Sequence, residues 1–377
     1  GGEYEATESR LLEPDAEWEW SFRLRDGVDI YGGFAGHERS PAERALAAAH
    51  DGIPPCAWDY ASATRLTIPD HAFGSVLKAD ADAFTLRTVV DGVVLCGGMA
   101  FSSGLAGVGG GAQLPGNVVL RRSVVTGCMA RYGGGVAMRG DSVLEQCLIC
   151  DNELLPDGWG AAGAGVYVID DEGRVSNCLI RDNGVADRGV QEGGGIYLLG
   201  AGTVNHCTIV GNYALHDGSG VCAPVAAARL LNLVVWGNCG NDKQLVAPAS
   251  DLSYSAIAGV NAPGQAVIPL AAGNCGVNGP EVNDNENDHY FICFRDLARN
   301  DYRLGAGSYA INRGVDALLA AHDAAGAARL SRLVPDPGAF ETAYRGQLCG
   351  DFQVETPCVY GWESLVTPRP GVCTPAM

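Results

Sequence analysis

The sequence predicts an all-β fold, a parallel β-helix, because two markers recur in phase along the chain and no helical segments separate them. The first marker is a glycine-rich strand opener that begins at residues 109, 133, 163, 193 and 218, at steps of 24, 30, 30 and 25 residues. Repeat periods of about 20 to 50 residues indicate a solenoid. No amphipathic stretch of about 10 to 15 residues lies between the openers, which disfavours leucine-rich and βαβ designs. Each coil is therefore expected to hold two or three short strands joined by turns.

The second marker is a pair of positions, five residues apart, in the apolar segment that follows each opener. Glycine at the opener permits a tight bend and close stacking of coils because it has no Cβ. Asparagine at a turn tolerates the left-handed conformation, and its amide can bond the Asn of the next coil. We therefore predict an inward ladder and a corner ladder, both structural. The inward ladder holds Ser123, Cys147, Cys178, Cys207 and Leu233, and the corner ladder holds Cys128, Asn152, Asn183, Asn212 and Asn238.

The elements ahead of the repeat are predicted from short runs. Residues 28–34 alternate in polarity and predict a strand that ends in a turn. Residues 41–50 predict a short helix that packs over the open end of the solenoid as an N-terminal cap, where an exposed strand edge would promote aggregation. Three apolar runs predict coils before the regular repeat, and they cover residues 65–68, 75–78 and 84–90.

The ladders are expected to extend beyond the five repeats. Thr88 aligns with Ser123 through the similar runs 86–90 and 121–125, and Ser255 continues the inward ladder after Leu233. With the early strands this predicts roughly nine or ten coils, about 45 Å of cylinder at ~4.8 Å per coil.

The repeat pattern loosens after residue 260, which divides the chain into three predicted regions. Residues 1–260 form the β-helix with its capping region, and residues 261–341 form terminal coils and a closing segment. Within the latter, residues 301–304 predict a strand and residues 315–322 a short helix. Residues 342–377 form an irregular C-terminal tail that contains proline and cysteine.

Composition excludes some classes of partner. The formal net charge is -19, and lysine occurs only at Lys78 and Lys243. Nucleic acid and anionic membrane surfaces are disfavoured because phosphate binding needs clustered Lys and Arg. A polyanionic ligand would need a local arginine cluster to outweigh the global charge. No run approaches 18 apolar residues, so no membrane span is predicted.

The 14 cysteines fall short of the composition of a disulfide scaffold. Cys147 and Cys150 form a C-x-x-C pair without a second such pair, and we expect Cys147 to stack inward as a small apolar residue. A disulfide along that ladder would be strained. Bridges are more natural among the tail residues Cys349, Cys358 and Cys373, which indicates a location outside the cytoplasm.

Several segments resemble one family. Gly32-Gly33-Phe34-Ala35-Gly36-His37-Glu38, followed by Arg44, resembles the opening segment of bacterial surface β-helix proteins with Pmp-like (polymorphic outer-membrane protein) repeats. The repeats around residues 193 and 205 are similar to theirs. The closing order resembles the choice-of-anchor Q domain that ends many such proteins: Asp301-Tyr302-Arg303-Leu304, residues 308–314, Asp323, Gly326, Arg329 and residues 336–341.

This resemblance covers about residues 5 to 341 and implies a right-handed parallel β-helix that is secreted or bound to the cell surface. It departs from the family pattern at Asn312, where Asp is usual, and at Pro337, where an aliphatic residue is usual. The family pattern carries no catalytic motif. It usually has one more N-terminal segment, and because the chain begins at Gly1 without Met or a signal-peptide pattern, we expect that a segment upstream has been removed.

The candidate site lies in the loops between the corner ladder and the next opener, because loops that interrupt a solenoid project on one face. The loop segments are residues 129–132, 153–162, 184–192 and 213–217. Aromatic faces there would stack on sugar rings, and carboxylates would act as acid and base or bind Ca²⁺. The candidate catalytic residues are Asp157, Asp187, Arg188 and His216, and the candidate ligand-binding residues are Tyr132, Trp159, Tyr213, Glu192 and Asp217.

A candidate calcium site lies in the acidic run 283–288, which collects hard oxygen ligands at Asp284, Glu286 and Asp288. The run lacks the glycine and the distal glutamate of an EF-hand loop, which favours the alternative interpretation as an exposed acidic loop.

Three functions remain open from the sequence. The first is a structural, adhesive or glycan-binding rod outside the cell, with an extracellular polysaccharide or a surface protein as partner. The second is a polysaccharide lyase or glycoside hydrolase in the loop groove, in which Arg188 or His216 would abstract a proton beside a uronate carboxylate. No acidic pair has the spacing of pectin-type enzymes, which favours the first. The third is a self-assembling filament or lattice of identical chains.

Overall fold

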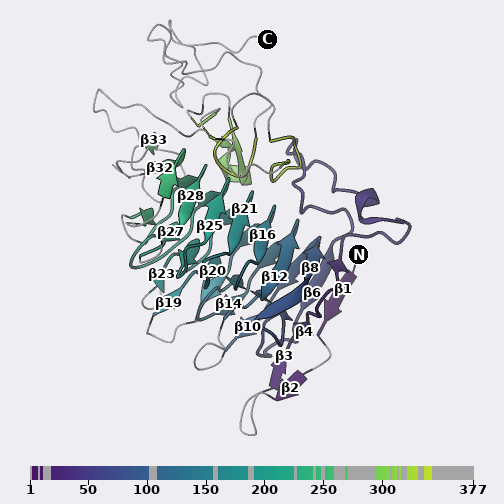
Figure 1. The fold of residues 1–377 in the computed structure, drawn as a ribbon. Coiled ribbons are helices and arrows are strands. Elements are labelled where there is room, and N and C mark those ends of the chain that lie inside the picture. The colour runs from purple at the N-terminus through teal and green to yellow at the C-terminus, as the bar shows by residue number, and fades with distance from the viewer. Residues whose placement is uncertain are drawn as a thin grey trace, which may run out of the picture.

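The computed structural model describes residues 2–6, 9–11, 18–101, 108–155, 160–185, 191–224, 227–240, 243–247, 251–258, 268–270, 292, 294–305, 308, 310–311, 314–315, 321–329 and 335–341. These residues wind into a parallel β-helix whose walls are three long sheets (Figure 1). Each complete coil contributes one strand to each wall, in the order sheet I, sheet II, sheet III, and sheet III has one further strand at each end.

Sheet I consists of β4 (Phe22–Arg23), β7 (Leu77–Lys78), β11 (Ala112–Leu114), β15 (Val136–Met138), β20 (Val166–Val168), β24 (Ile196–Leu198), β27 (Val221–Cys222) and β30 (Leu245–Val246). Sheet II consists of β5 (Ile30–Tyr31), β8 (Ala83–Asp91), β12 (Gly116–Arg121), β16 (Val143–Glu145), β21 (Arg174–Ser176), β25 (Thr203–Asn205), β28 (Arg229–Leu231) and β31 (Asp251–Ser253).

Sheet III consists of β1 (Gly2–Glu5), β6 (Thr64–Thr67), β9 (Val93–Cys96), β13 (Val124–Thr126), β17 (Leu148–Cys150), β22 (Leu179–Arg181), β26 (Thr208–Val210), β29 (Val234–Trp236), β32 (Ala256–Ala258) and β33 (Ile268–Leu270). Its ten strands in the described part of the chain agree with the predicted nine or ten coils.

Shorter elements decorate this cylinder. Two small parallel sheets lie in the loops, one of β10 (Met99–Ala100), β14 (Met129–Ala130) and β18 (Glu153–Leu154) and one of β19 (Ala161–Ala162) and β23 (Gln191–Glu192). Two antiparallel pairs join β2 (Ser9–Leu11) to β3 (Trp18–Trp20) and β34 (Phe294–Asp296) to β35 (Asp301–Leu304). The described helices are the 3-10 turns η1 (Pro41–Glu43) and η2 (Leu297–Arg299).

The inward ladder is confirmed. Cys147, Cys178 and Cys207 are fully buried in one apolar core that runs through the coils. Burial raises the pKa of the Cys178 thiol well above its ordinary value. Ser255 continues the ladder, since its Oγ accepts a 3.0 Å bond from the Leu233 amide. All nine cysteines in the described ranges carry free thiols, so no disulfide forms along this part of the ladder.

The corner ladder is also confirmed. The Asn183 Oδ1 atom accepts bonds from the Asn152 backbone N (3.1 Å) and Nδ2 (2.9 Å), and Asn212 repeats both contacts with Asn183. The series ends where Asn238 donates to the Gln244 Oε1 at 3.0 Å. Each asparagine side chain thus links one coil to the next by hydrogen bonds inside the corner.

The conformation expected of these asparagines was wrong. The left-handed residue at this corner is the one before the ladder position, namely Gly127, Asp151, Asp182, Gly211 or Gly237. A second left-handed position lies before the inward ladder, at Arg122, Gln146, Asn177, His206, Asn232 and Tyr254. The apolar run 204–210 is therefore two strands around a corner. The ladder Asn side chain must point inward to reach its neighbour, and the preceding residue makes the bend.

The alignment of Thr88 with Ser123 was wrong. Thr88 pairs with Val118 inside sheet II, and the position opposite Ser123 is Val93, whose amide donates to the Ser123 Oγ at 3.2 Å. The strand β8 is long and continues to the left-handed Gly92, so the true corner comes four residues after Thr88 and the ladder position Val93 comes five residues after it. Both segments contain β-branched pairs, which made the shifted alignment look equally good.

The helix predicted at residues 41–50 was also wrong. Only Pro41–Glu43 forms a 3-10 turn, and Arg44 is extended. The alanine run that follows pairs its backbone with residues 59–61, through Ala47 N to Asp59 O (2.6 Å) and Ala61 N to Ala45 O (2.9 Å). Residues 35–63 therefore form an irregular loop beside the solenoid, which we call the excursion. Tertiary pairing overrides the helical propensity of alanine here.

The closing segment, residues 292–341 where described, lies along the outer surface of sheet III. Its Ile292, Tyr302, Ala324 and Phe340 form a second apolar core with outward residues of that sheet and with Trp58 of the excursion. The Ala57 amide donates to the Ala324 carbonyl at 2.9 Å. Figure 1 shows the yellow-green closing segment beside the purple excursion. The tail 342–377 and most of the helix predicted at 315–322 lie outside the described residues, and the region boundaries stay a prediction.

Candidate functional site

The loop segments predicted as the candidate site lie together on one side of the solenoid, and we call this surface the ledge. Residues 129–132 and 213–217 are described in full, and the other two loops are described except for residues 156–159 and 186–190. The small sheets of β14 with β18 and of β19 with β23 order the ledge by parallel pairing. Asp157, Trp159, Asp187 and Arg188 lie outside the described residues.

Tyr132 belongs to an aromatic ladder. Its ring centroid lies 5.2 Å from that of Tyr167, which lies 5.4 Å from that of Tyr197. The Arg131 guanidinium sits 5.4 Å from the Tyr132 ring. Burial raises the pKa of Tyr167 to about 12. The rings cover one another, so they stabilise the ledge and offer edges and hydroxyls more than open faces.

The sequence did not single out Tyr167 and Tyr197 as partners of Tyr132. The signal was present, because both occupy the middle position of the strand after an opener, thirty residues apart, and the register pairs them directly. Recognising it requires knowing that this position faces outward from sheet I.

The other candidate residues that the structure describes link neighbouring coils, and their side chains do not converge on one point. The Asp217 carboxylate pairs with the Lys243 Nζ at 2.6 Å, and its carbonyl accepts from Gly193. The His216 amide donates to the Gln191 carbonyl at 3.0 Å, and Tyr213 bridges to Cys239. Burial raises the pKa of Cys222 to about 12, and the nearby charges of Glu192 and Asp217 add to this. Glu192 and Asp217 therefore share one neighbourhood on the ledge.

No group of three or more His, Cys, Asp or Glu side chains that could hold a metal ion occurs among the described residues. The candidate calcium ligands Asp284, Glu286 and Asp288 lie outside those residues.

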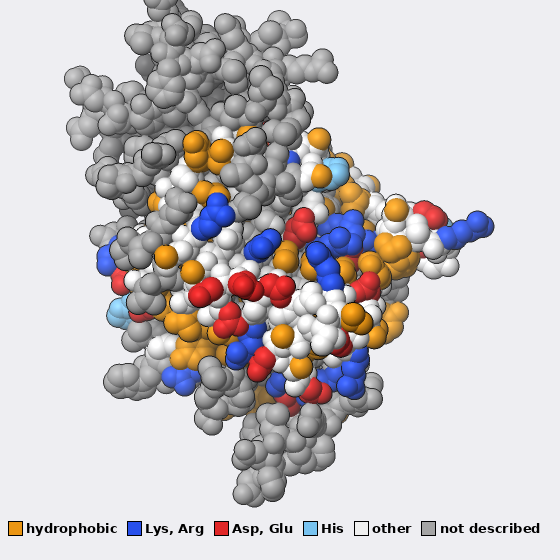
Figure 2. All heavy atoms as spheres, viewed as in Figure 1, with side chains coloured by type: hydrophobic (Ala, Val, Ile, Leu, Met, Phe, Trp, Pro, Cys, Tyr) orange, Lys and Arg blue, Asp and Glu red, His pale blue; other side chains and the backbone are white. Residues whose placement is uncertain are grey.

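Acidic side chains gather across the face seen in Figure 2. Separately, the turns from sheet I to sheet II carry several carboxylates, and each accepts a backbone N–H from a neighbouring coil. The contacts are Asp141 to Asn117 (2.6 Å), Asp170 to Gly140 (2.8 Å) and Asp171 to Ala201 (2.8 Å). These carboxylates hold the turns in register, which explains them without a ligand.

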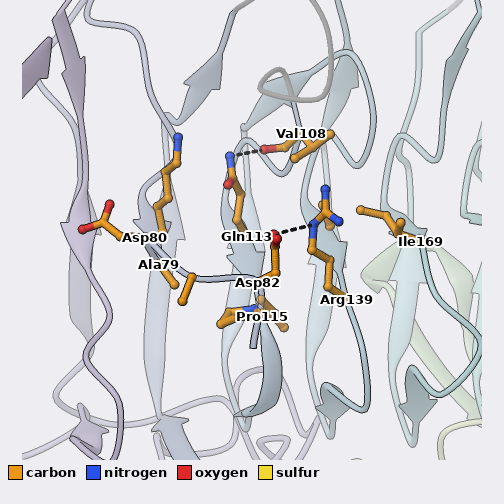
Figure 3. A pocket seen from close by; sticks show the side chains of 12 residues that line it. Ala79, Asp80, Asp82, Val108, Gln113, Pro115, Arg139 and Ile169 are labelled. Atoms are coloured by element: carbon orange, nitrogen blue, oxygen red, sulfur yellow. Dashed lines mark hydrogen bonds and ion pairs between the residues drawn. The ribbon is translucent and has the colours of Figure 1, made fainter. Parts of the chain in front are cut away.

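A hollow of about 220 Å³ lies where the earliest of these turns meet (Figure 3). The four charged side chains that line it, Lys78, Asp80, Asp82 and Arg139, each lie beside a partner. The Lys78 Nζ bonds Glu19 at 2.6 Å, Arg23 bonds Asp80 at 2.9 Å, and the Arg139 Nε lies 3.7 Å from Asp82. Gln113 is fixed by its bond to the Val108 carbonyl at 2.8 Å.

The hollow can recognise hydroxyl groups chemically. Lys78, Gln113 and Arg139 present donors, and Asp80 and Asp82 present acceptors, within one small concavity. Pockets for drug-sized ligands measure about 300 to 1,000 Å³, so this one suits a single sugar residue of a longer chain. The sequence did not indicate this hollow, because its residues come from four coils and only the register brings them together.

Comparison with known proteins supports the fold. The family model described as a right handed beta helix region matches residues 81–226. No curated protein and no solved structure matches the chain significantly. The predicted right-handed parallel β-helix is thereby confirmed. Pmp-like repeats, the anchor segment, bacterial origin and a place outside the cell stay predictions. No helix in the described residues is long and apolar enough to cross a membrane.

Proposed function

We propose that the protein is a structural or adhesive β-helix, placed outside the cell, that binds an extended glycan at the hollow beside its loop ledge. The observation that carries this proposal is the hollow itself, where donors and acceptors are held apart by fixed partners on a rigid wall. Preformed polar groups lose little entropy on binding. Sugar hydroxyls both donate and accept, so they match this mixture.

Binding is favoured over catalysis by the pairing of the carboxylates. Asp80 and Asp82 each lie beside an arginine, at 2.9 Å from Arg23 and 3.7 Å from Arg139, so both carboxylates are placed as acceptors. A glycosidase needs one carboxylic acid that stays protonated to donate to the leaving group.

The test is a binding assay of the full chain against immobilised neutral and uronate-containing polysaccharides. We expect at least one to bind, and Arg139→Gln to weaken that binding about three- to tenfold, the loss of one charge-assisted hydrogen bond. Arg174→Gln, an exposed arginine on sheet II outside the hollow, serves as the control and should bind as the unaltered chain does.

Absence of binding to every polysaccharide, or equal binding by Arg139→Gln, would overturn the proposal. The same incubations, with Ca²⁺ present, should be followed for ultraviolet absorbance of new double bonds and for new reducing ends. Either signal would replace the binding role by the lyase or hydrolase alternative.

A further inference from the structure

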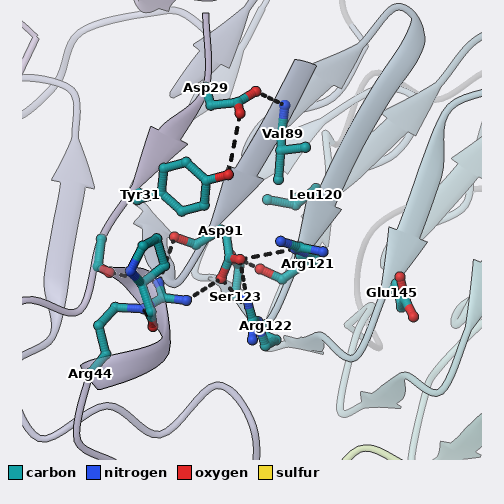
Figure 4. Close-up of polar contacts among 12 residues, drawn as sticks. Asp29, Tyr31, Arg44, Val89, Asp91, Leu120, Arg121, Arg122, Ser123 and Glu145 are labelled. Carbon is teal, nitrogen blue, oxygen red and sulfur yellow. Dashed lines mark hydrogen bonds and ion pairs between the residues drawn. The ribbon is translucent and has the colours of Figure 1, made fainter. Parts of the chain in front are cut away.

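Three arginines surround one buried carboxylate at the corner between sheets II and III (Figure 4). Asp91, at the end of β8, is fully buried. It accepts from the Arg44 Nη2 at 3.0 Å, the Arg121 Nε at 2.9 Å and the Arg122 Nε at 3.0 Å. The Arg122 Nη2 atom also donates to it.

The sequence brings these groups together through the coil register. Arg121 is the direct pairing partner of Asp91 in the next coil, and Arg122 is the left-handed corner residue that follows. Arg44 arrives from the excursion, where its guanidinium packs 4.5 Å from the Tyr60 ring and donates to the Gly32 carbonyl at 2.8 Å. Burial raises the pKa of Asp91, but the hydrogen bonds and charges of Arg122 and Arg44 outweigh it, and the pKa lies below the ordinary value. Asp91 is therefore an anion.

The cluster carries more positive charge than Asp91 can balance. One carboxylate faces three guanidinium groups, which leaves two positive charges. The Arg44 side chain is 1% exposed, so it is out of reach of an external ligand. The side chains of Arg121 and Arg122 are 34% and 31% exposed. Glu145, the pairing partner of Arg121 in the following coil, lies apart from Asp91 in Figure 4 and forms no ion pair with Arg121 or Arg122, although its charge acts on Arg122.

The outward donors of this pair are available. Among the described residues, the salt bridges of Arg121 and Arg122 go to Asp91 alone, and the Nη atoms of Arg121 donate to no described residue. Figure 2 shows Lys and Arg side chains gathered on this face beside the excursion. A planar guanidinium with free Nη groups matches a carboxylate or a sulfate ester.

We propose that Arg121 and Arg122 form an anion-binding site for an acidic polysaccharide, one that carries carboxylate or sulfate groups at intervals along its chain. Asp91 holds both arginines in place, and an external anion relieves their mutual repulsion. A nucleic acid fits less well, because it carries a charge every ~1.7 Å and needs many clustered cations. A chain with widely spaced charges can place one group here while avoiding the acidic surface of a protein of net charge -19.

The experiment measures the affinity of the full chain for polygalacturonate, dextran sulfate and neutral dextran at about 50 mM and 300 mM salt, a range over which exposed charges become screened. We expect at least one of the two polyanions to bind at low salt, and neutral dextran not to. Arg121→Gln should weaken polyanion binding at least fivefold and flatten its salt dependence. Its thermal midpoint should stay near that of the unaltered chain, because Asp91 keeps Arg44 and Arg122. The control Arg174→Gln removes one charge elsewhere on sheet II and should retain binding.

Two further measurements sharpen the outcome. Arg121→Lys keeps the charge but loses the planar donors, so it should bind with intermediate affinity, and it serves in place of Arg121→Gln should that variant fold poorly. Preference between the two polyanions identifies carboxylate or sulfate as the group bound. Equal weakening by the control, absence of polyanion binding at low salt, or equally tight binding of a single-stranded DNA oligonucleotide would overturn the proposal. Arg139→Gln, which alters the hollow, should leave the effect of Arg121→Gln on polyanion binding unchanged, so the two proposals fail separately.

Discussion

At the scale of single residues, the stability of the coil stack depends on buried asparagine side chains whose hydrogen-bond partners are fixed by the packing. Asn183 is fully buried, and its side chain donates to the Ile149 carbonyl at 3.0 Å and to Asn212 while accepting from Asn152. Buried polar groups of this kind are costly when a partner is removed. The sequence predicted this ladder from spacing alone, because a buried Asn in every coil must find its counterpart one coil away.

Replacing one such asparagine should therefore lower the stability of the folded protein. We expect Asn183→Ala to lower the free energy of unfolding by about 2 to 4 kcal/mol, since it removes the acceptor of the Asn152 backbone N–H and one donor to the Ile149 carbonyl inside the core. Arg174→Ala, on an exposed position of β21, should change it by less than about 0.5 kcal/mol. Urea denaturation of both variants checks this. A loss no larger than that of Arg174→Ala would show that water replaces the amide.

At the scale of secondary-structure elements, the glycine openers have two separate physical roles. The first glycine of each opener has a positive φ, for example +66° at Gly133, so it makes the bend. The third has no positive φ and is needed for space alone, because a Cβ at Gly135 would lie 2.6 Å from the Gly165 carbonyl oxygen of the next coil, whereas the first glycine is both bent and crowded. The sequence showed that glycine recurs, but only the register of neighbouring coils shows which glycine bends and which one is crowded.

A pair of alanine substitutions separates crowding from bending, with the corner residue Gly127 as the example of a bend without crowding. Gly135→Ala should destabilise the protein by about 1 to 3 kcal/mol or more, because backbone of the adjacent coil must move. Gly127→Ala, at φ +61° with no atom within 4 Å of the new Cβ, should cost only the left-handed penalty of about 1 to 2 kcal/mol. Comparing the two by thermal unfolding, with a crystal structure of Gly135→Ala to detect the shifted coil, gives the answer. A smaller effect at Gly135 than at Gly127 would contradict the crowding argument.

At the scale of the whole molecule, the closing segment is fastened to the side of the solenoid by a buried charge cluster. Arg329 is fully buried, donates to the Gly338 carbonyl at 2.8 Å and to Asn177, and lies 3.6 Å from Glu341. Asp323 and Asp336 stand close by, so one cation faces three carboxyl groups. Burial, followed by the charge of Asp336, raises the pKa of Glu341 to about 8.

This cluster makes stability depend on pH. Because the pKa of Glu341 is raised in the folded protein, the folded state retains a proton that the unfolded chain releases near pH 4.5. The associated stability is complete below that pH and is lost as the pH rises through about 8. We expect a loss of about 1 kcal/mol between pH 7 and pH 9. Glu341→Gln, which stays neutral and can still accept from the Asp336 amide, should flatten this dependence.

Thermal unfolding at pH 7, 8 and 9 measures the effect, and hydrogen exchange at Ala57 and Ala339 reports whether the closing segment loosens with it. Glu172→Gln, an exposed carboxylate in a turn, is the control. Parallel pH profiles of Glu341→Gln and the unaltered chain would exclude Glu341 as the titrating group.

The sequence by itself determined the solenoid, the number of coils and both ladders, because identical letters at a fixed step must stack when the coils repeat. Only the tertiary structure decided the contacts between coils and across the chain. The register placed Arg121 and Arg122 on Asp91, and the packing of Phe340 near Trp58 carried the closing segment to the side of sheet III. Periodicity specifies neighbours one repeat apart. It contains no information about contacts that occur only once in the fold, such as those between segments 47 or 282 residues apart. The tertiary structure alone shows those contacts.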